Sequence, residues 1–579
     1  MLPALLLMPR PDDSVLDMCA APGSKSLQLI EMARGGSGMV WCNDASLGRA
    51  ISLNHRLQAP NVCSPRTIVT SVDGRRWPHL GGLRFDRVLV DVPCSGDGMR
   101  RKRHANTPPW RASRALELHA TQLRLLREGL RALRPGGRLV YSTCSLNPIE
   151  NEAVVAAALR PYFGGGGGVG GGDGIVIELE EPRALVPGGL AGLALSPGLR
   201  TWSVDAPATD DDNDADDANA DAPRVEPPSS VHPPAADDEA GAWLGEQLAL
   251  TARLLPHRAA SGGFFVASFR KAADPAAEVA AVVEEAVEVR GAELDPAGDA
   301  LAEKLPLDAS VVAAAGDDEA DGDDEAEKDE KDDEKDDEKD EKDELLEPLS
   351  VRGAEEWRRI ASFYGVADAA VPRGTELLWA PRRASRRAKV YLASDGAARA
   401  VLRHWQPAQL AYGGRRGRRS PLRGRLHHVG LKAFEKLKLR NLANADAFPC
   451  EWRLCQPALP AALAWVSRRV LRTPSEQLFA AALASGGLDC DTLRSLGGAD
   501  TCLDADGTLV PGGAVLCLTV APAGPEEDAG RAEGAPQHHL EETLACVAAV
   551  IMPGAGGLTV YAPKEERQGM LALLDEDAS

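Results

Sequence analysis

Two cysteines stand where a side chain can do chemistry. Cys94 and Cys144 lie at the ends of apolar, strand-like runs, FDRVLVDVPCSGDG (85–98) and GRLVYSTCS (137–145), and each is followed by serine. A lone buried cysteine is usually an inert, small hydrophobic residue. Because the carboxyl ends of parallel strands meet at one edge of a sheet, two cysteines at such ends predict a pair of thiols near a crevice rather than in the core.

The stretch SVLDMCAAPGSKSL (14–27) has the pattern of a strand, a tight turn and a helix. Val15 and Leu16 suit a buried strand, Pro22 and Gly23 turn the chain, and Ser24 can cap the helix that follows. Backbone N–H groups at such a helix start face the crevice where open α/β sheets bind nucleotide-like cofactors, although an ordinary α/β crossover has the same pattern. A phosphate-binding GxxxxGK[ST] loop does not fit the order GSK, and GxGxxG is absent.

Acidic residues end the next apolar runs, Asp44 in GMVWCND (38–44) and Asp73 in TIVTSVD (67–73). An acid after the second strand commonly binds ribose hydroxyls, but Asp44 could instead cap the helix expected over 47–57. Helical spacing over 113–133, ended by PGG (135–137), continues a repeated βαβ pattern. These elements predict a parallel sheet whose carboxyl ends gather six residues, Cys19, Asp44, Asp73, Asp91, Cys94 and Cys144.

The net charge of −21 is unevenly distributed along the 579 residues. Residues 1–160 carry 22 basic and 13 acidic side chains and residues 351–440 carry 21 and 6, whereas residues 161–350 carry 14 and 48. The basic segments can attract phosphate backbones, and 382–425 is the segment expected to bind them, although its loop at about 415–425 could equally be a basic disordered linker. The like charges of 316–344 cannot pack together, so we expect that stretch to be a spacer that catalysis does not need.

The cysteines and the hydropathy of the sequence indicate the cellular compartment in which the protein resides. Eleven cysteines without a paired spacing indicate a reducing environment, and no apolar stretch reaches the 18 residues of a membrane span. Cys450, Cys455, His427 and His428 could suggest zinc, but a second clean ligand pair is missing and no metal site is predicted. We expect a soluble, intracellular protein.

These patterns predict an α/β fold with three regions. The first, 1–271, is a Rossmann-like catalytic sheet with a disordered insertion at about 203–240 and a closing strand in GGFFVASFRK (262–271). The second, 272–349, is an acidic disordered linker. The third, 350–570, is a basic, mostly β region of the kind that binds RNA.

Three motifs, DMCAAPGSKS, DVPCSGDGMRRK and YSTCSLNPIENEAVV, resemble the hallmark motifs of the Nop/Sun RNA cytosine-5 methyltransferases. SPGLRTW (196–202), RLLPHRAASGGFFVASFRK, HHVGLKAFEK and YAPKEER are most similar to the eukaryotic multisite tRNA branch of that family. The resemblance implies a Rossmann-like methyltransferase with S-adenosyl-L-methionine as cofactor and RNA, above all tRNA, as partner. It also implies a nuclear or nucleolar location, or otherwise a cytoplasmic one, and no obligate protein partner or membrane.

The resemblance assigns a role to each site residue. Carbon-5 of cytosine is a poor nucleophile, so a thiolate must first add to carbon-6. Cys144 would be that nucleophile, Cys94 would assist proton elimination and product release, and Asp91 would contact the N3 and N4 edge of the base. The cofactor would be bound by Cys19, Ala20, Ala21, Pro22, Gly23, Ser24, Lys25, Asp44 (ribose), Asp73 (adenine) and Asp91.

Other functions compete with this one. A ribosomal RNA methyltransferase of the same family is an alternative, as is an RNA-binding assembly factor that keeps the fold without turnover. A DNA cytosine-5 methyltransferase would use Cys94 as nucleophile and would not need Cys144. Family members also carry a region ahead of the first motif, of which only MLPALLL is present, so we expect a truncated N-terminus.

Overall fold

The computed structural model describes most of residues 1–272 and describes the C-terminal part in pieces. The described residues are 2–58, 62–79, 83–102, 113–165, 176–185, 193–204, 227–235, 237–259, 261–272, 347–348, 354–366, 375–380, 388–405, 425–437, 448–463, 466–506, 508–519, 543–551, 557–560, 567–568, 570–572 and 574. Met1–Ala272 and Asp343–Ser579 form one compact unit, and Ala273–Lys342 forms a second that lies outside the described residues. The acidic run 316–344, most of the insertion at 203–240 and most of the basic segment 382–425 also lie outside them, and the three-region division stays a prediction.

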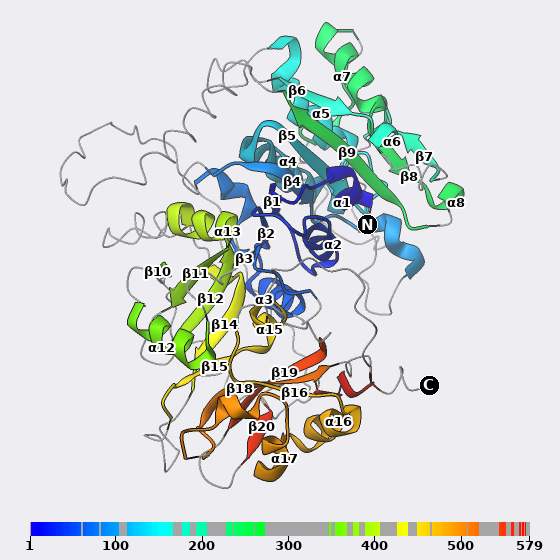
Figure 1. Cartoon of the computed structure of the whole chain (residues 1–579). Coiled ribbons are helices and arrows are strands. Elements are labelled where there is room, and N and C mark those ends of the chain that lie inside the picture. The colour runs from blue at the N-terminus through cyan, green and yellow to red at the C-terminus, as the bar shows by residue number, and fades with distance from the viewer. Residues whose placement is uncertain are drawn as a thin grey trace, which may run out of the picture. The chain divides into compact units, whose positions relative to one another are not determined.

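Five parallel strands form the centre of the first sheet, in the order β3-β2-β1-β4-β5 (Figure 1). They are β1 (Ser14–Asp17), β2 (Met39–Asn43), β3 (Thr67–Ser71), β4 (Phe85–Asp91) and β5 (Leu133–Thr143). Strand β9 (Phe264–Lys271) pairs antiparallel with β5. The order reverses between β1 and β4, which is the switch point of a doubly wound sheet. The predicted Rossmann-like fold is therefore confirmed.

The strands are apolar on both faces because helices cover both. One face, with Val15, Val40 and Leu89, packs in the same core as Leu29 and Leu53 of α2 and α3, and the other face, with Leu16, Trp41 and Val88, packs with α4 and α5. The helices of this part are α1 (Leu2–Leu7), α2 (Ser24–Met32), α3 (Leu47–Leu57), α4 (Ser113–Ala132), α5 (Glu152–Leu159), α6 (Pro182–Leu185), α7 (Glu239–Ala249) and α8 (Pro256–Ala259). The sheet is extended beyond β9 by β8 (Ala252–Leu254) and β7 (Leu195–Pro197), while β6 (Ile177–Glu180) also pairs with β9.

Two local predictions need correction. Helix α2 begins at Ser24, and its capping residue is Gly23 in a left-handed conformation with φ of 102°, so Ser24 is not the cap. Strand β5 begins at Leu133 and runs through PGG, because Leu133 already pairs with Phe85 across an irregularity in the ladder. The PGG motif therefore lies within the strand instead of preceding it.

The C-terminal part contains two further sheets among its described residues. One has the order β10-β11-β12-β14-β15 and the other β16-β18-β19-β20-β17. Their strands are β10 (Glu347–Pro348), β11 (Thr375–Ala380), β12 (Lys389–Ser394), β14 (Leu431–Lys436), β15 (Trp452–Leu454), β16 (Val470–Thr473), β17 (Gly487–Leu488), β18 (Gly512–Thr519), β19 (Thr543–Ile551) and β20 (Leu558–Val560). The helices are α12 (Ala354–Tyr364), α13 (Asp395–Arg399), α15 (Leu459–Ala462), α16 (Glu476–Ser485) and α17 (Cys490–Arg494).

One C-terminal strand belongs to the first sheet. Strand β13 (Arg425–Val429) pairs antiparallel with β3, and Trp405 packs against Trp41 with ring centroids 6.0 Å apart. His427 and His428 lie in this strand, whereas Cys450 belongs to the core around β14 and β15 and Cys455 is buried directly after β15. No cluster of three or more metal-binding side chains occurs in the described part of the chain. Among those same residues, no helix is long and apolar enough to cross a membrane.

Candidate active site

The site lies at the carboxyl ends of β1, β4 and β5, beside the switch point of the sheet. Asp91 ends β4, and its Oδ2 lies 2.6 Å from Nζ of Lys25, the second residue of α2. The other Asp91 oxygen accepts a hydrogen bond of 2.6 Å from the Ser142 hydroxyl on β5. The structure therefore places Lys25 and Asp91, two of the predicted site residues, in direct contact.

The two cysteines form a pair. The Sγ atoms of Cys94 and Cys144 are 3.1 Å apart, and both side chains are half-buried. The hydrogen bond from the Cys94 thiol lowers the pKa of Cys144 against the opposing effects of burial and of the Asp91 carboxylate, and the nearby Lys25 ammonium lowers it further. The same hydrogen bond, together with burial, raises the pKa of Cys94. The thiolate form is thus favoured on Cys144 over Cys94.

Glu150 joins the two cysteine loops. Its side chain is fully buried, and Oε1 accepts hydrogen bonds from the Ser95 backbone N–H at 2.8 Å and from Gln122 Nε2 at 2.9 Å. Its Oε2 accepts from the Ser145 hydroxyl at 2.6 Å and from the Ser95 hydroxyl. Because each cysteine is followed by one of these serines, a single carboxylate sets the spacing of both thiols.

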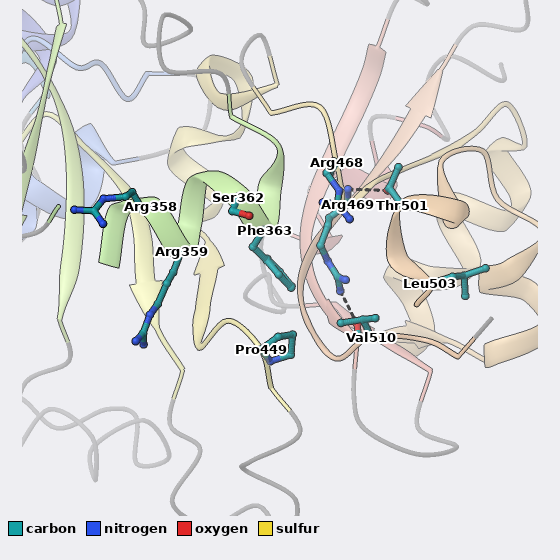
Figure 2. A pocket seen from close by; sticks show the side chains of 10 residues that line it. All are labelled: Arg358, Arg359, Ser362, Phe363, Pro449, Arg468, Arg469, Thr501, Leu503 and Val510. Carbon is teal, nitrogen blue, oxygen red and sulfur yellow. Dashed lines mark hydrogen bonds between the residues drawn. The ribbon is translucent and has the colours of Figure 1, made fainter. Parts of the chain in front are cut away.

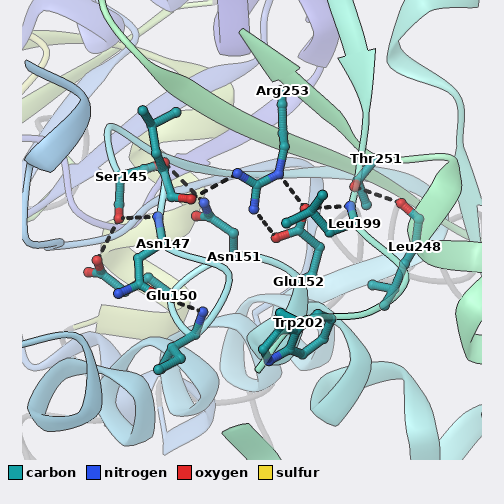
Figure 3. Close-up of polar contacts among 12 residues, drawn as sticks. Ser145, Asn147, Glu150, Asn151, Glu152, Leu199, Trp202, Leu248, Thr251 and Arg253 are labelled. Atoms are coloured by element: carbon teal, nitrogen blue, oxygen red, sulfur yellow. Dashed lines mark hydrogen bonds and ion pairs between the residues drawn. The ribbon is translucent and has the colours of Figure 1, made fainter. Parts of the chain in front are cut away.

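A buried ion pair supports the loop after Cys144. Figure 3 shows Arg253 of β8 reaching Glu152 at the start of α5. Arg253 Nε lies 2.6 Å from Glu152 Oε1, and a second guanidinium nitrogen donates to the carbonyl of Leu146 at 2.8 Å. The Leu199 N–H donates to the same carboxylate at 2.8 Å, so the SPGLRTW segment is tied to the site. Each charge of the pair is satisfied by additional hydrogen bonds, which a buried ion pair requires.

Gly98 is needed where the SGDG loop crosses the TCS loop. Its N–H donates to the Cys144 carbonyl at 3.0 Å, and its own carbonyl accepts from the Gly263 N–H at 2.7 Å. A Cβ at this position would lie 2.6 Å from the Gly263 oxygen and 2.8 Å from the Cys144 oxygen. No side chain fits there, so the glycine lets three segments of the site pack backbone to backbone.

The predicted cofactor turn lies next to Asp44. This carboxylate is 3 % exposed and accepts hydrogen bonds from the N–H of Ala21 at 3.3 Å and of Ser46 at 3.0 Å. Arg49 contacts both Asp44 Oδ2, at 3.3 Å, and the Ala21 carbonyl, at 2.6 Å. The turn is therefore held in place by the acid that ends the neighbouring strand. Burial raises the pKa of the Cys19 thiol well above its usual range, which disfavours its thiolate form.

Asp73 is placed differently from Asp44. It lies just after β3, is partly exposed, and pairs with Arg75, whose guanidinium contacts both carboxylate oxygens at 2.9 and 3.1 Å. The structure therefore brings Asp44 to the turn and leaves Asp73 further along the same sheet edge.

Sequence reasoning missed two buried polar residues at this edge. Asp17 ends β1 and accepts a 2.8 Å hydrogen bond from Ser26, while its Oδ1 has no partner among the described residues. Burial raises its pKa to about 7. Asn43 ends β2 and donates to the carbonyls of Met18 and Val72, at 3.1 and 2.8 Å, so that it bridges β1 and β3. The strand-end pattern that pointed to Asp44 applies equally to both and could have found them.

The chain is similar to known RNA methyltransferases. Residues 4–162 match the family described as 16S rRNA methyltransferase RsmB/F. The tRNA (cytosine(34)-C(5))-methyltransferase of Drosophila melanogaster is 38 % identical over 295 residues, covering 47 % of this chain and 36 % of the relative. The multisite-specific tRNA:(cytosine-C(5))-methyltransferase of Saccharomyces cerevisiae is 38 % identical over 288 residues, covering 47 % and 38 %.

A ribosomal RNA enzyme also matches. The 5-cytosine rRNA methyltransferase NSUN4 of Bos taurus is 42 % identical over 167 residues, covering 28 % of this chain and 43 % of the relative. These matches confirm the resemblance predicted from the three motifs. The chain spans less than two fifths of the length of the two tRNA relatives.

Proposed function

We propose that this chain, whose residues 4–162 match the RsmB/F methyltransferase family, transfers a methyl group from S-adenosyl-L-methionine to carbon-5 of cytosine in RNA. The observation that carries the proposal is the thiol pair, with Cys94 and Cys144 3.1 Å apart next to Asp91 and Lys25. Transfer RNA is the proposed substrate, because the similarity to the tRNA enzymes extends over 295 residues and to the ribosomal enzyme over 167. The proposed location is the nucleus or nucleolus.

The residues at the sheet edge fit the proposed cofactor. Asp44 is a buried acid at the end of the second strand, where ribose hydroxyls are commonly bound. Gly23 has a φ of 102° and a Cβ there would lie 2.8 Å from Leu53, so the turn stays free of side-chain bulk. The turn from Cys19 to Lys25, with Asp44, would hold the cofactor, and Asp73 would lie toward the adenine. When bound, S-adenosyl-L-methionine supplies the electrophilic methyl group that carbon-5 takes up.

The chain's own residues perform the remaining steps. The Cys144 thiolate forms a bond to carbon-6 of cytosine, and the electron pair of the 5,6 double bond makes carbon-5 nucleophilic. Negative charge then develops toward N3, and we assign Asp91 to that edge of the base, with the Lys25 ammonium beside it to offset the charge. The base must leave its stack to reach these groups.

Release needs a second thiol. Once Cys144 is bonded to carbon-6 it no longer accepts the Cys94 proton. Cys94 then gives that proton to solvent and, as a thiolate, removes the proton of methylated carbon-5. The electrons of the broken C–H bond restore the 5,6 double bond and expel the Cys144 thiolate. With the two sulfurs 3.1 Å apart, one sulfur bonded to carbon-6 would leave the other within reach of carbon-5.

Bisulfite sequencing tests this function. The purified chain would be incubated with S-adenosyl-L-methionine and, separately, with a tRNA transcript, a ribosomal RNA fragment and a cytosine-containing DNA duplex. We expect protected cytosines in tRNA, none with Cys144→Ala, and unchanged protection with Cys490→Ala, a half-buried cysteine at the start of α17. Protection only in ribosomal RNA would support the alternative substrate. RNA binding without protection would support a non-catalytic assembly factor, and protection only in DNA would refute the proposal.

A further inference from the structure

The C-terminal part contains a cavity lined by arginines, far in the sequence from Cys94 and Cys144. Its volume is about 590 Å³ (Figure 2). The polar residues that line it are Arg358, Arg359, Ser362, Arg468, Arg469 and Thr501. Among the described residues that line it there is no aspartate or glutamate. A cavity with four arginines and no acid has the electrostatics of an anion site.

Helix α12 forms one wall because of its periodicity. Arg359 and Phe363 are four residues apart and so lie on the same face of the helix, which faces the cavity. Ile360 and Tyr364 lie on another face and are fully buried in the core. The Tyr364 hydroxyl donates to the Trp452 carbonyl at 3.1 Å, which fixes the helix against β15. The arginine-bearing face is therefore held in one orientation.

The opposite wall is built around a buried cation. Arg469 is 2 % exposed, with a φ of 65° that side chains rarely adopt. Its guanidinium donates to the carbonyls of Gly513 at 2.8 Å and Val510 at 2.9 Å and lies 4.4 Å from the centre of the Phe363 ring. Its backbone N–H donates to the Thr501 hydroxyl at 2.8 Å.

No carboxylate pairs with Arg469 in the described part of the chain. Its side-chain partners there are backbone carbonyls and the Phe363 ring. A buried charge without a counter-charge is costly to maintain. Arg468 precedes it and is exposed, as Arg359 is across the cavity. Positive charge is therefore concentrated on both walls with an unbalanced cation behind them, and an anion entering the cavity would offset it.

We infer that this cavity binds phosphate groups of the RNA backbone. Guanidinium groups bind phosphate oxygens through paired N–H donors, and the hydroxyl of Ser362 can add a neutral hydrogen bond. A volume of about 590 Å³ accommodates more than one phosphate, which suits a continuous strand. The inference deepens the proposed function, on which it rests, by naming a place where the RNA substrate is held away from the thiols.

The experiment measures binding by the full chain without turnover. Fluorescence anisotropy of a labelled tRNA transcript would be recorded from 0.05 to 0.4 M salt for the wild type and for Arg359→Gln with Arg468→Gln. Each lost phosphate contact lowers the slope of log affinity against log salt by roughly 0.7 to 0.9, so two contacts lower it by about 1.5. If the wild type and the variant bind tRNA equally at 1 M salt, this difference in slope makes the variant bind roughly 15-fold more weakly at 0.15 M salt.

Two comparisons make the result decisive. The control double variant Arg34→Gln with Arg494→Gln removes the same charge from exposed i,i+3 ion pairs on α2's C-terminal side and α17, and should keep the wild-type slope. Arg359→Lys with Arg468→Lys should recover the slope but not the full affinity, since lysine keeps the charge without the planar donors. Matching thermal unfolding curves for all variants show that each is folded.

An unchanged slope in the Arg359 and Arg468 double variant would overturn the inference, as would an equal loss in the control variant. If inorganic phosphate binds the cavity at millimolar concentration but does not displace tRNA, the cavity is a site for small anions, and that result would also overturn the inference. Because the assay needs no cofactor and no adduct, RNA binding through this cavity can succeed while methylation fails. The two proposals are therefore tested separately.

Discussion

Glu150 is expected to act by positioning the thiols, and two substitutions separate this role from a chemical one. Glu150→Gln keeps the size of the side chain and removes its charge. The amide oxygen can face the N–H groups of Ser95 and Gln122, and the amide nitrogen can donate to the hydroxyls of Ser95 and Ser145. All four contacts survive as neutral hydrogen bonds.

The expected cost follows from those contacts. Charge-assisted hydrogen bonds contribute about 1.5 to 3 kcal/mol and neutral ones about 0.5 to 1.5, but burying a neutral amide avoids part of the desolvation cost of a carboxylate. We therefore expect Glu150→Gln to lower the free energy of unfolding by about 1 to 2 kcal/mol. Glu150→Ala leaves the buried donors of Ser95 and Gln122 without acceptors and should cost about 3 to 5 kcal/mol.

Urea unfolding and the rate of covalent adduct formation with tRNA measure the two effects. Glu150→Gln should form the adduct within about tenfold of the wild-type rate, which is about 1.4 kcal/mol of barrier. Glu150→Ala should be far slower, while Glu117→Gln, an exposed control on α4, should change neither quantity. If Glu150→Gln is folded but as inactive as Glu150→Ala, the carboxylate does chemistry and the positioning role is refuted.

Three further outcomes are expected. The stability advantage of Asp17→Asn over the wild type should be larger at pH 8 than at pH 4. Because Asp17 has a pKa of about 7 in the native state, the native wild type binds more protons than the unfolded chain between pH 4 and 7. The free energy of unfolding of the wild type should therefore fall by on the order of 4 kcal/mol over that range, and that of the variant should not. Lys25→Met removes a cation that lowers the pKa of Cys144, so the pH profile of adduct formation at saturating cofactor should shift to higher pH. Each pH unit of that shift should make adduct formation at neutral pH about tenfold slower. An unshifted profile would contradict this role of Lys25. Deleting residues 316–344 should leave methylation unchanged or raise it, because their like charges repel RNA phosphates, and a loss of more than about tenfold would refute the spacer role.

Much of the site could be predicted because short stretches of sequence determine where its residues lie. Cys94, Cys144 and Asp91 each end a short apolar run, and parallel strands bring such ends together whatever the rest of the chain does. Lys25 follows from the turn after β1 in the same way. The helix cap was harder, since Gly23 and Ser24 both suit a helix start and only the left-handed conformation of Gly23 decides between them.

Other features depend on contacts between distant segments. The pairing of β13 with β3 joins residues more than 350 positions apart, and an antiparallel edge strand leaves no local signal of its partner. The role of Glu150 depends on two serines from different loops and on Gln122 from α4. Arg469 reads as an ordinary basic residue until its guanidinium is found buried against Phe363. In each case the missing information is tertiary.

The central claim is that Cys144 is the nucleophile and that Cys94 assists release of the product. Denaturing electrophoresis of protein–RNA adducts tests this claim most directly. Incubated with tRNA and S-adenosyl-L-methionine, Cys94→Ala should accumulate a covalent adduct, because addition and methyl transfer proceed while release is impaired. Cys144→Ala should give no adduct and no methylation, because addition to carbon-6 precedes every other step. An adduct formed by Cys144→Ala but not by Cys94→Ala would contradict the account and make Cys94 the nucleophile.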